Sequence, residues 1–183
     1  MSIKKYFPKP GLQGLTLTAE MIGLEIVFER MLKAVDLPLM RISLGFLPIA
    51  VLAVYLGPLY ASFAWAAADV IGFFIFPSGF PYFPGFTASA FISGMIFGFI
   101  LYKNGGKIVR TVVASGIVCI ADVFFLRLLW LRIMMRIGNM DAVPMEVTVA
   151  ARAIQVAIIF PVQCIFIYLV GVAIKKVKFR NIS

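Results

Sequence analysis

Apolar runs of about 20 residues recur along the whole chain, and this feature restricts its folding more than any other. A run of that length can cross a hydrocarbon core of about 30 Å as a helix. The chain has 183 residues, of which 62% are hydrophobic and 14% charged, against about 45–50% and about 25% in soluble proteins. No polar stretch is long enough for a soluble domain. We therefore predict a single integral membrane domain over residues 1–183, embedded in the lipid bilayer.

The runs predict an all-α fold with six transmembrane helices in one bundle. The expected helices cover residues 15–34, 38–56, 58–76, 86–102, 107–135 and 144–174. The first contains Glu20, Glu25, Glu29 and Arg30, which are costly in lipid, so we expect this helix to be packed inside the bundle. Pro144 suits the first position of the last helix, and Pro161 suits a kink within it.

The distribution of basic residues predicts the orientation. An even number of helices places both termini on one side, and ten of the seventeen Lys and Arg residues then share that side. They are Lys4, Lys5, Lys9, Lys103, Lys107, Arg110, Lys175, Lys176, Lys178 and Arg180. Cytoplasmic ends of membrane proteins collect Lys and Arg. Both termini, including segment 1–13, are therefore expected in the cytoplasm, and this topology accounts for the net charge of +9 without a nucleic-acid partner.

Several kinds of chemistry are not expected. The sequence has no histidine, and HExxH, GxSxG and GxxxxGK[ST] are absent. Cys119 and Cys164 lie in apolar runs without a CxxC spacing, so they are interpreted as packing residues. We expect no metal site, no cofactor, no catalytic residue and no nucleophile–base pair of an enzyme.

Charged residues also occur within the outer half of the predicted helices. Asp69, Asp122 and Arg152 each lie roughly 10 Å or more from a helix end at 1.5 Å per residue. A charge at the bilayer centre costs about 2.5–3.5 kcal/mol on insertion scales, which indicates a compensating polar cavity. Two alternatives are ion pairs that only join helices and, for Arg127, Arg132 and Arg136, side chains that reach the outer interface.

The segment FPSGFPYFPGFT, residues 76–87, interrupts two apolar runs with three prolines, two glycines and five aromatic residues. Prolines restrict its backbone, and aromatic faces can stack on a flat solute. We interpret 76–86 as an outer aromatic loop above a binding cavity. The alternative is an aromatic belt at the membrane interface.

From Leu37 onward the sequence closely resembles the folate-specific S components of energy-coupling factor (ECF) transporters. The resemblance rests on RIS-GF-PI at 41–49, the Gly57-Pro58 turn, AD-IG at 68–72 and the block YFPGFT at 82–87. It resumes with a tryptophan, AR at 151–152 and PVQ followed by YL near the end. Arg127 departs from the pattern, which has a small polar residue such as asparagine ahead of Trp130.

The resemblance implies a membrane subunit of a prokaryotic cell that binds folate with high affinity outside and releases it inside. Such subunits associate with a transmembrane coupling subunit and with two cytoplasmic ATPases, which hydrolyse the ATP. The small-residue motif that docks the coupling subunit corresponds to Ala19 and Gly23 here. The alternatives are an S component for another small vitamin and a structural membrane protein without transport activity.

Folate would make three kinds of contact. Its pterin edge suits carboxylates or Gln, its benzoyl linker suits aromatic rings, and its glutamate tail suits Arg. The expected pterin ligands are Asp69, Asp122 and Gln155, and the expected carboxylate ligands are Arg41 and Arg152. The aromatic candidates are Phe46 in the RIS-GF-PI block and the loop residues Phe80, Tyr82, Phe83 and Phe86.

Overall fold

The protein is described by a computed structural model. It covers residues 11–32, 35–37, 40–77, 82–104, 106–137 and 144–176. Within these ranges, the side chains of 35–37, 40, 41, 123, 175 and 176 are outside the description.

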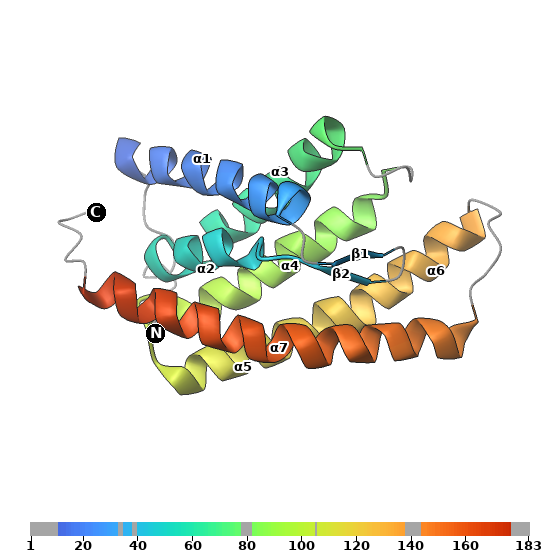
Figure 1. The fold of residues 1–183 in the computed structure, drawn as a ribbon. Helices are drawn as coiled ribbons and strands as arrows, with labels where there is room; N and C mark the ends of the chain where they lie inside the picture. Colours follow the sequence, from blue (N-terminus) through green and yellow to red (C-terminus); the bar gives the residue numbers. More distant parts are fainter. Residues whose placement is uncertain are drawn as a thin grey trace.

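The chain forms an elongated bundle of helices (Figure 1). The elements are α1 (Leu12–Ile26), the π-helical turn η2 (Val27–Met31), β1 (Val35–Leu37), β2 (Met40–Ile42), α2 (Phe46–Tyr55), α3 (Pro58–Ile75), α4 (Pro84–Leu101), α5 (Ile108–Val118), the π-helical segment η3 (Cys119–Leu126), α6 (Arg127–Ile137) and α7 (Met145–Lys176). Since α5, η3 and α6 follow one another without a break, the seven α labels make six helices. This confirms the predicted all-α fold with six helices.

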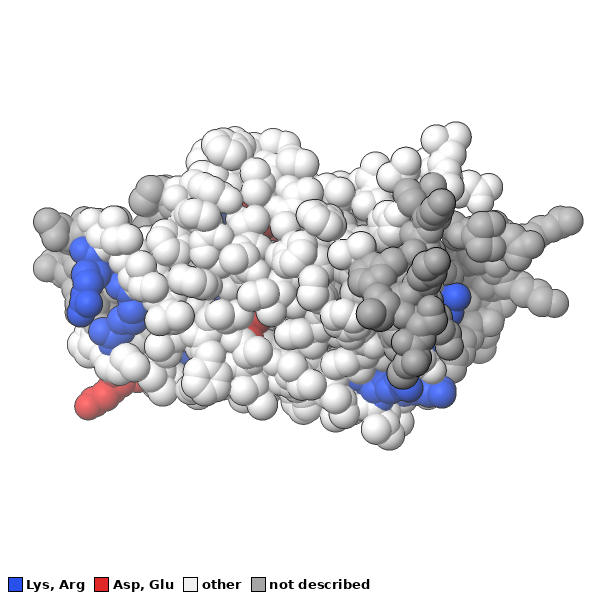
Figure 2. Space-filling view, turned by 180° about the vertical axis from the view of Figure 1, so that it is seen from behind, with Lys and Arg blue, Asp and Glu red and all other residues white. Residues whose placement is uncertain are grey.

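The surface of the bundle suits a membrane. In the part of the chain that the structure describes, four helices are long and apolar enough to cross a bilayer, namely Pro58–Ile75, Pro84–Leu101, Ile108–Ile137 and Met145–Ile174. The face shown in Figure 2 carries its blue side chains at the two ends and a broad, largely uncharged band between them. The protein is therefore a multi-pass membrane protein.

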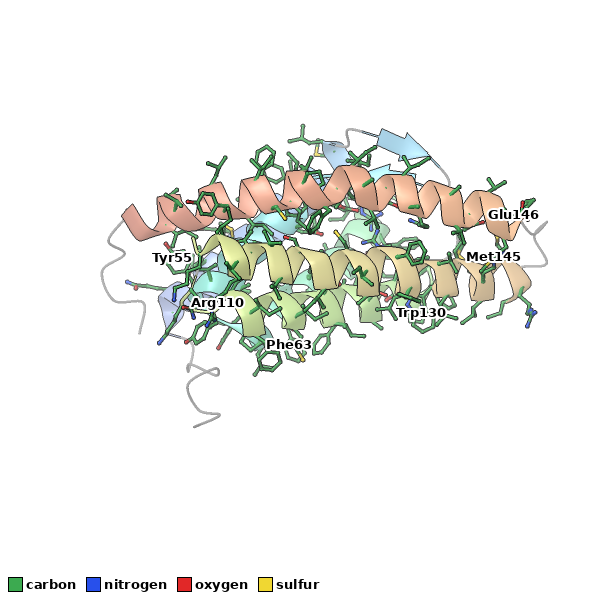
Figure 3. The ribbon with its side chains drawn as sticks, turned by 90° about the horizontal axis from the view of Figure 1, so that it is seen from below. Tyr55, Phe63, Arg110, Trp130, Met145 and Glu146 are labelled. Carbon is green, nitrogen blue, oxygen red and sulfur yellow. The ribbon has the colours of Figure 1, made fainter. Side chains whose placement is uncertain are left out.

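The ends of the helices agree with an even number of crossings. The start of α1 and the end of α7 lie at the same end of the bundle (Figure 1). Arg110 lies at this end too, whereas Met145 and Glu146 lie at the opposite one (Figure 3). Helix α7 begins one residue after Pro144, whose carbonyl accepts the Thr148 N–H at 3.2 Å, and the helix continues through Pro161.

The second helix begins at Phe46 and not at Pro38, so its predicted start was wrong. Before it, β1 and β2 form a short antiparallel hairpin in which Val35 is paired with Ile42 and Leu37 with Met40. A short apolar run does not distinguish a strand from a helix, and the β-branched residues Val35 and Ile42 favour the strand.

The first helix lies at the edge of the bundle, which corrects the expectation that it is packed inside. It packs against α2 and α3, while Leu12, Leu15 and Leu24 on its other side are exposed. Glu25 faces inward and is only 2% exposed. Burying one face of the helix is enough to remove this charge from lipid.

Helices α3 and α4 approach each other closely because α4 carries glycines at the contact. A Cβ atom at Gly94 would lie 2.6 Å from the Ala61 carbonyl oxygen, and one at Gly98 would lie 2.1 Å from Pro58 Cα. Beside this contact Trp65 of α3 stacks on Phe97 of α4, with ring centroids 5.8 Å apart. Small residues allow such contacts in membranes, where packing replaces the hydrophobic effect between helices.

We expect Gly98→Ala to lower the free energy of unfolding by about 1–3 kcal/mol, the usual cost of overpacking. The clash is with backbone and cannot be relieved by rotating a side chain. Gly116→Ala is the matched control, because a Cβ there would meet Phe160 at an ordinary 3.6 Å. Unfolding by sodium dodecyl sulfate in mixed micelles measures both variants. Equal stability of the two variants would contradict the packing argument.

Candidate binding site

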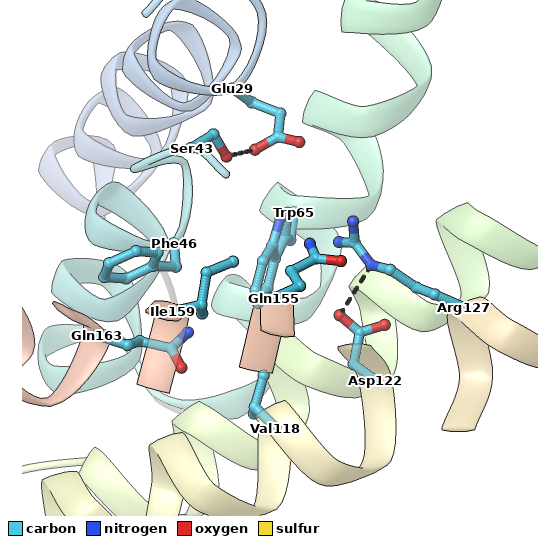
Figure 4. A pocket seen from close by; sticks show the side chains of 10 residues that line it. All are labelled: Glu29, Ser43, Phe46, Trp65, Val118, Asp122, Arg127, Gln155, Ile159 and Gln163. Carbon is cyan, nitrogen blue, oxygen red and sulfur yellow. Dashed lines mark hydrogen bonds and ion pairs between the residues drawn. The ribbon is translucent and has the colours of Figure 1, made fainter. Parts of the chain in front are cut away.

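A cavity of about 40 Å³ lies between the end of the first helix, the start of α2, and helices α3, α5, α6 and α7 (Figure 4). Polar, charged and aromatic side chains surround it. The lining residues are Glu29, Ser43, Phe46, Trp65, Val118, Asp122, Arg127, Gln155, Ile159 and Gln163.

Polar groups at this cavity are buried without being fully paired. Gln155 accepts a hydrogen bond from Arg152 Nη1 at 2.7 Å, and both residues are buried. Within the described residues, one carboxylate oxygen of Asp122 and Nε of Arg152 have no hydrogen-bond partner. A buried polar atom without a partner costs free energy. The Asp122 oxygen therefore gives the cavity an unused acceptor, and Arg152 Nε is an unused donor on a residue that contacts the lining residue Gln155.

The π-helical segment η3 brings Asp122 and Arg127 together. The Arg127 N–H bonds to the Asp122 carbonyl oxygen, which is the five-residue bond of a π-helix. In an α-helix, residues five apart lie about 140° apart around the axis and cannot meet. Here Arg127 Nε lies 3.4 Å from Asp122 Oδ2. Arg127 is thus a residue of the cavity, which favours the ion-pair alternative over a side chain that reaches the outer interface.

A group of aromatic rings lies beyond the cavity lining, where α4 and α6 meet. Phe83 contacts Phe86 and Trp130, with centroid distances of 5.9 and 5.8 Å. Trp130 Nε1 donates to Ser89 Oγ at 2.9 Å. A Cβ at Gly85 would lie 2.4 Å from the Phe83 ring and 2.6 Å from the Trp130 ring. Gly85 is therefore the residue that leaves room for both rings.

A second group joins the end of the first helix to α3 and α4. Arg30 Nη2 lies 3.4 Å from Asp69 Oδ1, and Thr87 Oγ1 donates to Asp69 Oδ2 at 2.7 Å. Tyr82 contacts the rings of Phe73 and Phe74, with centroid distances of 5.3 and 6.0 Å.

The structure brings together part of the predicted site. Three of its ten residues line the cavity, namely Phe46, Asp122 and Gln155, and Arg152 contacts Gln155. Asp69, Tyr82, Phe83 and Phe86 are not among the lining residues. Arg41 belongs to β2, but its side chain is outside the description, as is the whole of Phe80. Ligand contacts by all ten remain predictions.

Sequence reasoning missed several lining residues, and one set had a usable signal. Ile159 and Gln163 follow the predicted residue Gln155 at intervals of four, so all three lie on one face of α7. Trp65 and Val118 have no comparable signal, because an apolar residue in a membrane helix can face any side. Glu29 and Ser43 come together only through the fold, where the Ser43 hydroxyl donates to the Glu29 carboxylate.

The cavity is small compared with sites for whole metabolites. Its volume of about 40 Å³ is enough for about three water molecules, whereas sites for drug-sized ligands measure about 300–1,000 Å³. The lining elements must therefore move apart to admit a solute of that size.

These features define a class: a helical, multi-pass membrane protein with a polar cavity inside its bundle. No protein-family model matches the chain. The chain is 36% identical to the folate transporter FolT of Clostridium novyi (strain NT) over 163 residues, which cover 89% of this chain and 90% of that protein. It is 30% identical to the folate transporter FolT of Leuconostoc mesenteroides subsp. mesenteroides over 158 residues, covering 86% and 83%.

The fold is similar to that of a solved relative as well. A crystal structure of FolT bound with folic acid matches with a TM-score of 0.79 and 31% identity, over 93% of this chain and 96% of that one. The chain belongs to the FolT family, the folate-specific S components of ECF transporters. This confirms the resemblance seen in the sequence, and it makes the protein a transport subunit and not an enzyme.

Arg127→Met should lower the free energy of unfolding by about 2 kcal/mol, because it leaves the buried Asp122 without its cation. Breaking a fully buried pair costs about 3–5 kcal/mol, and we expect less here because the Arg127 side chain is 29% exposed. The double variant Asp122→Asn/Arg127→Met should recover at least half of the loss.

Arg136→Met at the exposed end of α6 is the control and should change stability by less than about 0.5 kcal/mol. All three proteins can be compared by detergent-induced unfolding. If the single and double variants lose the same stability, the pair does not compensate Asp122.

Proposed function

We propose that this chain captures folate with high affinity on the outside of a prokaryotic plasma membrane and releases it inside the cell. Release follows association with a transmembrane coupling subunit and two cytoplasmic ATPases. The proposal is supported by the FolT relatives and by the folic acid bound to the similar solved structure.

The observation that carries the proposal is an unused oxygen of the cavity residue Asp122, together with an unused N–H of Arg152, which contacts the lining residue Gln155. A pterin edge presents N–H donors beside a carbonyl acceptor. Within the described residues, Asp122 has an oxygen without a partner and Arg152 has an N–H without one. Charge-assisted hydrogen bonds of this kind are about twice as strong as neutral ones. Trp65 lines the cavity together with Asp122 and offers an aromatic face there.

Titration of the purified chain with folate tests the proposal, and the two tryptophans make the test specific. Trp65 lines the cavity, whereas Trp130 lies against Phe83. Folate should therefore quench Trp65, so Trp130→Phe should retain most of the fluorescence change and Trp65→Phe should lose most of it. Equilibrium dialysis with labelled folate confirms binding by each variant independently of fluorescence.

Riboflavin and pantothenate are the competitors in the same dialysis. We expect that neither vitamin displaces folate, because neither presents the donor and acceptor pattern of the pterin edge. Binding of one of them in preference to folate would show an S component of different specificity, and absence of folate binding by the unmodified chain would refute the proposed function.

The proposed contact with the coupling subunit lies on α1. Ala19 and Gly23 are exposed on this helix, and a Cβ at Gly23 would meet no atom within 4 Å. Residues four apart share one face of a helix, and small residues there allow another helix to approach closely. The proposed orientation, with the start of α1 and the end of α7 in the cytoplasm, places this face within reach of a partner on the inner side.

Ala19→Trp and Gly23→Trp should leave folate binding unchanged and abolish folate uptake. The new ring points away from the bundle, so it obstructs only a partner. Leu24→Trp is the control, because Leu24 is exposed on the same helix but about 140° around the axis from Ala19. Uptake is measured in cells that supply the other subunits. Normal uptake by both test variants would exclude this docking face.

A further inference from the structure

Two of the sequence blocks that carry the family resemblance meet away from the cavity. The AD-IG block contains Asp69 and Gly72 of α3, and the YFPGFT block runs from Tyr82 to Thr87 at the start of α4. None of these four residues lines the cavity. Their presence therefore needs an explanation other than contact with the cavity.

Asp69 is the centre of a continuous chain of polar contacts. Its Oδ1 is 3.4 Å from Arg30 Nη2, and its Oδ2 accepts the Thr87 hydroxyl at 2.7 Å. The Thr87 oxygen is in turn 2.8 Å from the Tyr82 hydroxyl. Arg30 Nη2 also lies 3.5 Å from the Asp69 carbonyl oxygen. Each carboxylate oxygen of Asp69 is thus engaged by a different structural element.

Gly72 makes room for this arrangement. A Cβ at this position would lie 3.2 Å from Arg30 Nε and 3.6 Å from Arg30 Cγ. That first distance is tighter than ordinary van der Waals contact. The Arg30 side chain therefore passes over α3 at Gly72, one turn after Asp69, and reaches the carboxylate oxygen that Thr87 does not contact.

We propose that Asp69 is a positioning residue, not a folate ligand, and that it fixes the segment Tyr82–Thr87 to the end of the first helix through Thr87 and Arg30. Within this segment Phe83 packs on Phe86 and on Trp130, and Trp130 lies three residues after the cavity residue Arg127. A change at Asp69 acts on the binding site through this packing. The expected effect of Asp69 on ligand affinity rests on the proposed folate binding.

The geometry distinguishes this role from direct binding. Asp122 lines the cavity and, within the described residues, has one carboxylate oxygen without a partner. Each oxygen of Asp69, in contrast, already interacts with a protein group, and Asp69 is not among the residues that line the cavity. Its contacts join three elements that are otherwise separated in sequence by 39 and 18 residues.

Amide hydrogen exchange of the folate-free protein tests the positioning role directly. Thr87→Val removes the hydroxyl that links Tyr82 to Asp69 while keeping the size of the side chain. It should accelerate exchange in residues 82–87 about tenfold, and Asp69→Ala should do the same. Thr87→Ser retains the hydroxyl and should exchange like the unmodified chain. Tyr82→Phe, which removes one hydroxyl at an exposed position and leaves folding intact, should give a smaller acceleration of about threefold.

Folate dissociation constants then separate positioning from ligand contact. Thr87→Val and Asp69→Ala should each weaken binding by about tenfold, the scale of one lost hydrogen bond to a charged group. The double variant should be weaker than either single variant by less than twofold, because both remove the same link. Thr87→Ser should restore the affinity.

Two results would overturn the inference: unchanged exchange in residues 82–87 in both Thr87→Val and Tyr82→Phe, or losses of affinity that multiply in the double variant. If the unmodified chain binds no folate, the proposed function fails, and the exchange experiment alone still decides whether Asp69 holds the segment.

Discussion

Compensation of charges inside an apolar bundle is the constraint on which the rest of this structure depends. A charge that enters the membrane region must be paired there or face a polar cavity. Arg30 pairs with Asp69 and Arg127 pairs with Asp122. The first pair joins the end of the peripheral first helix to α3, and the second lies within one continuous helix, where the π-helical turn of η3 brings its two residues together. One pair thus links two helices, and the other compensates a charge beside the cavity.

The same pairing lowers the cost of an empty site. An unpaired buried charge is expensive, whereas the Asp122–Arg127 pair leaves only part of its hydrogen-bonding capacity unused. A transport subunit has to exist both with and without its solute. A site whose charges pair with each other can close to a cavity of about 40 Å³ and still retain donors and acceptors for a polar ligand. The affinity for a ligand then depends on how much more favourable the free energy of its hydrogen bonds is than that of the bonds already made within the protein.

The sequence was sufficient for the class of fold, and it was insufficient wherever the answer depended on backbone geometry. Apolar runs predicted six helices, because the length needed to cross a bilayer leaves few alternatives. The hairpin before α2 was missed, because a run as short as Val35 to Ile42 does not distinguish a strand from a helix. Asp122 and Gln155 were found at the cavity because a buried charge or amide needs a polar environment. The role of Arg127 stayed open, because its place in the cavity follows from the π-helical turn, and no residue type marks such a turn. For Asp69 the sequence had a different limit. A charge in a membrane helix indicates that the residue has a partner, but it does not indicate whether that partner is a ligand or another residue of the protein.

The π-helical segment η3 also has a consequence for how relatives of this protein can diverge. A π turn holds one residue more than the α turn it replaces, so losing a single residue there can restore an α turn and leave the helix after it facing as before. Only the side chains within the turn would change direction, and Asp122 and Arg127 would lose the five-residue spacing that now joins them. A change in the charges at the cavity can therefore arise from one deleted codon, in addition to the substitutions that comparisons of aligned sequences usually consider.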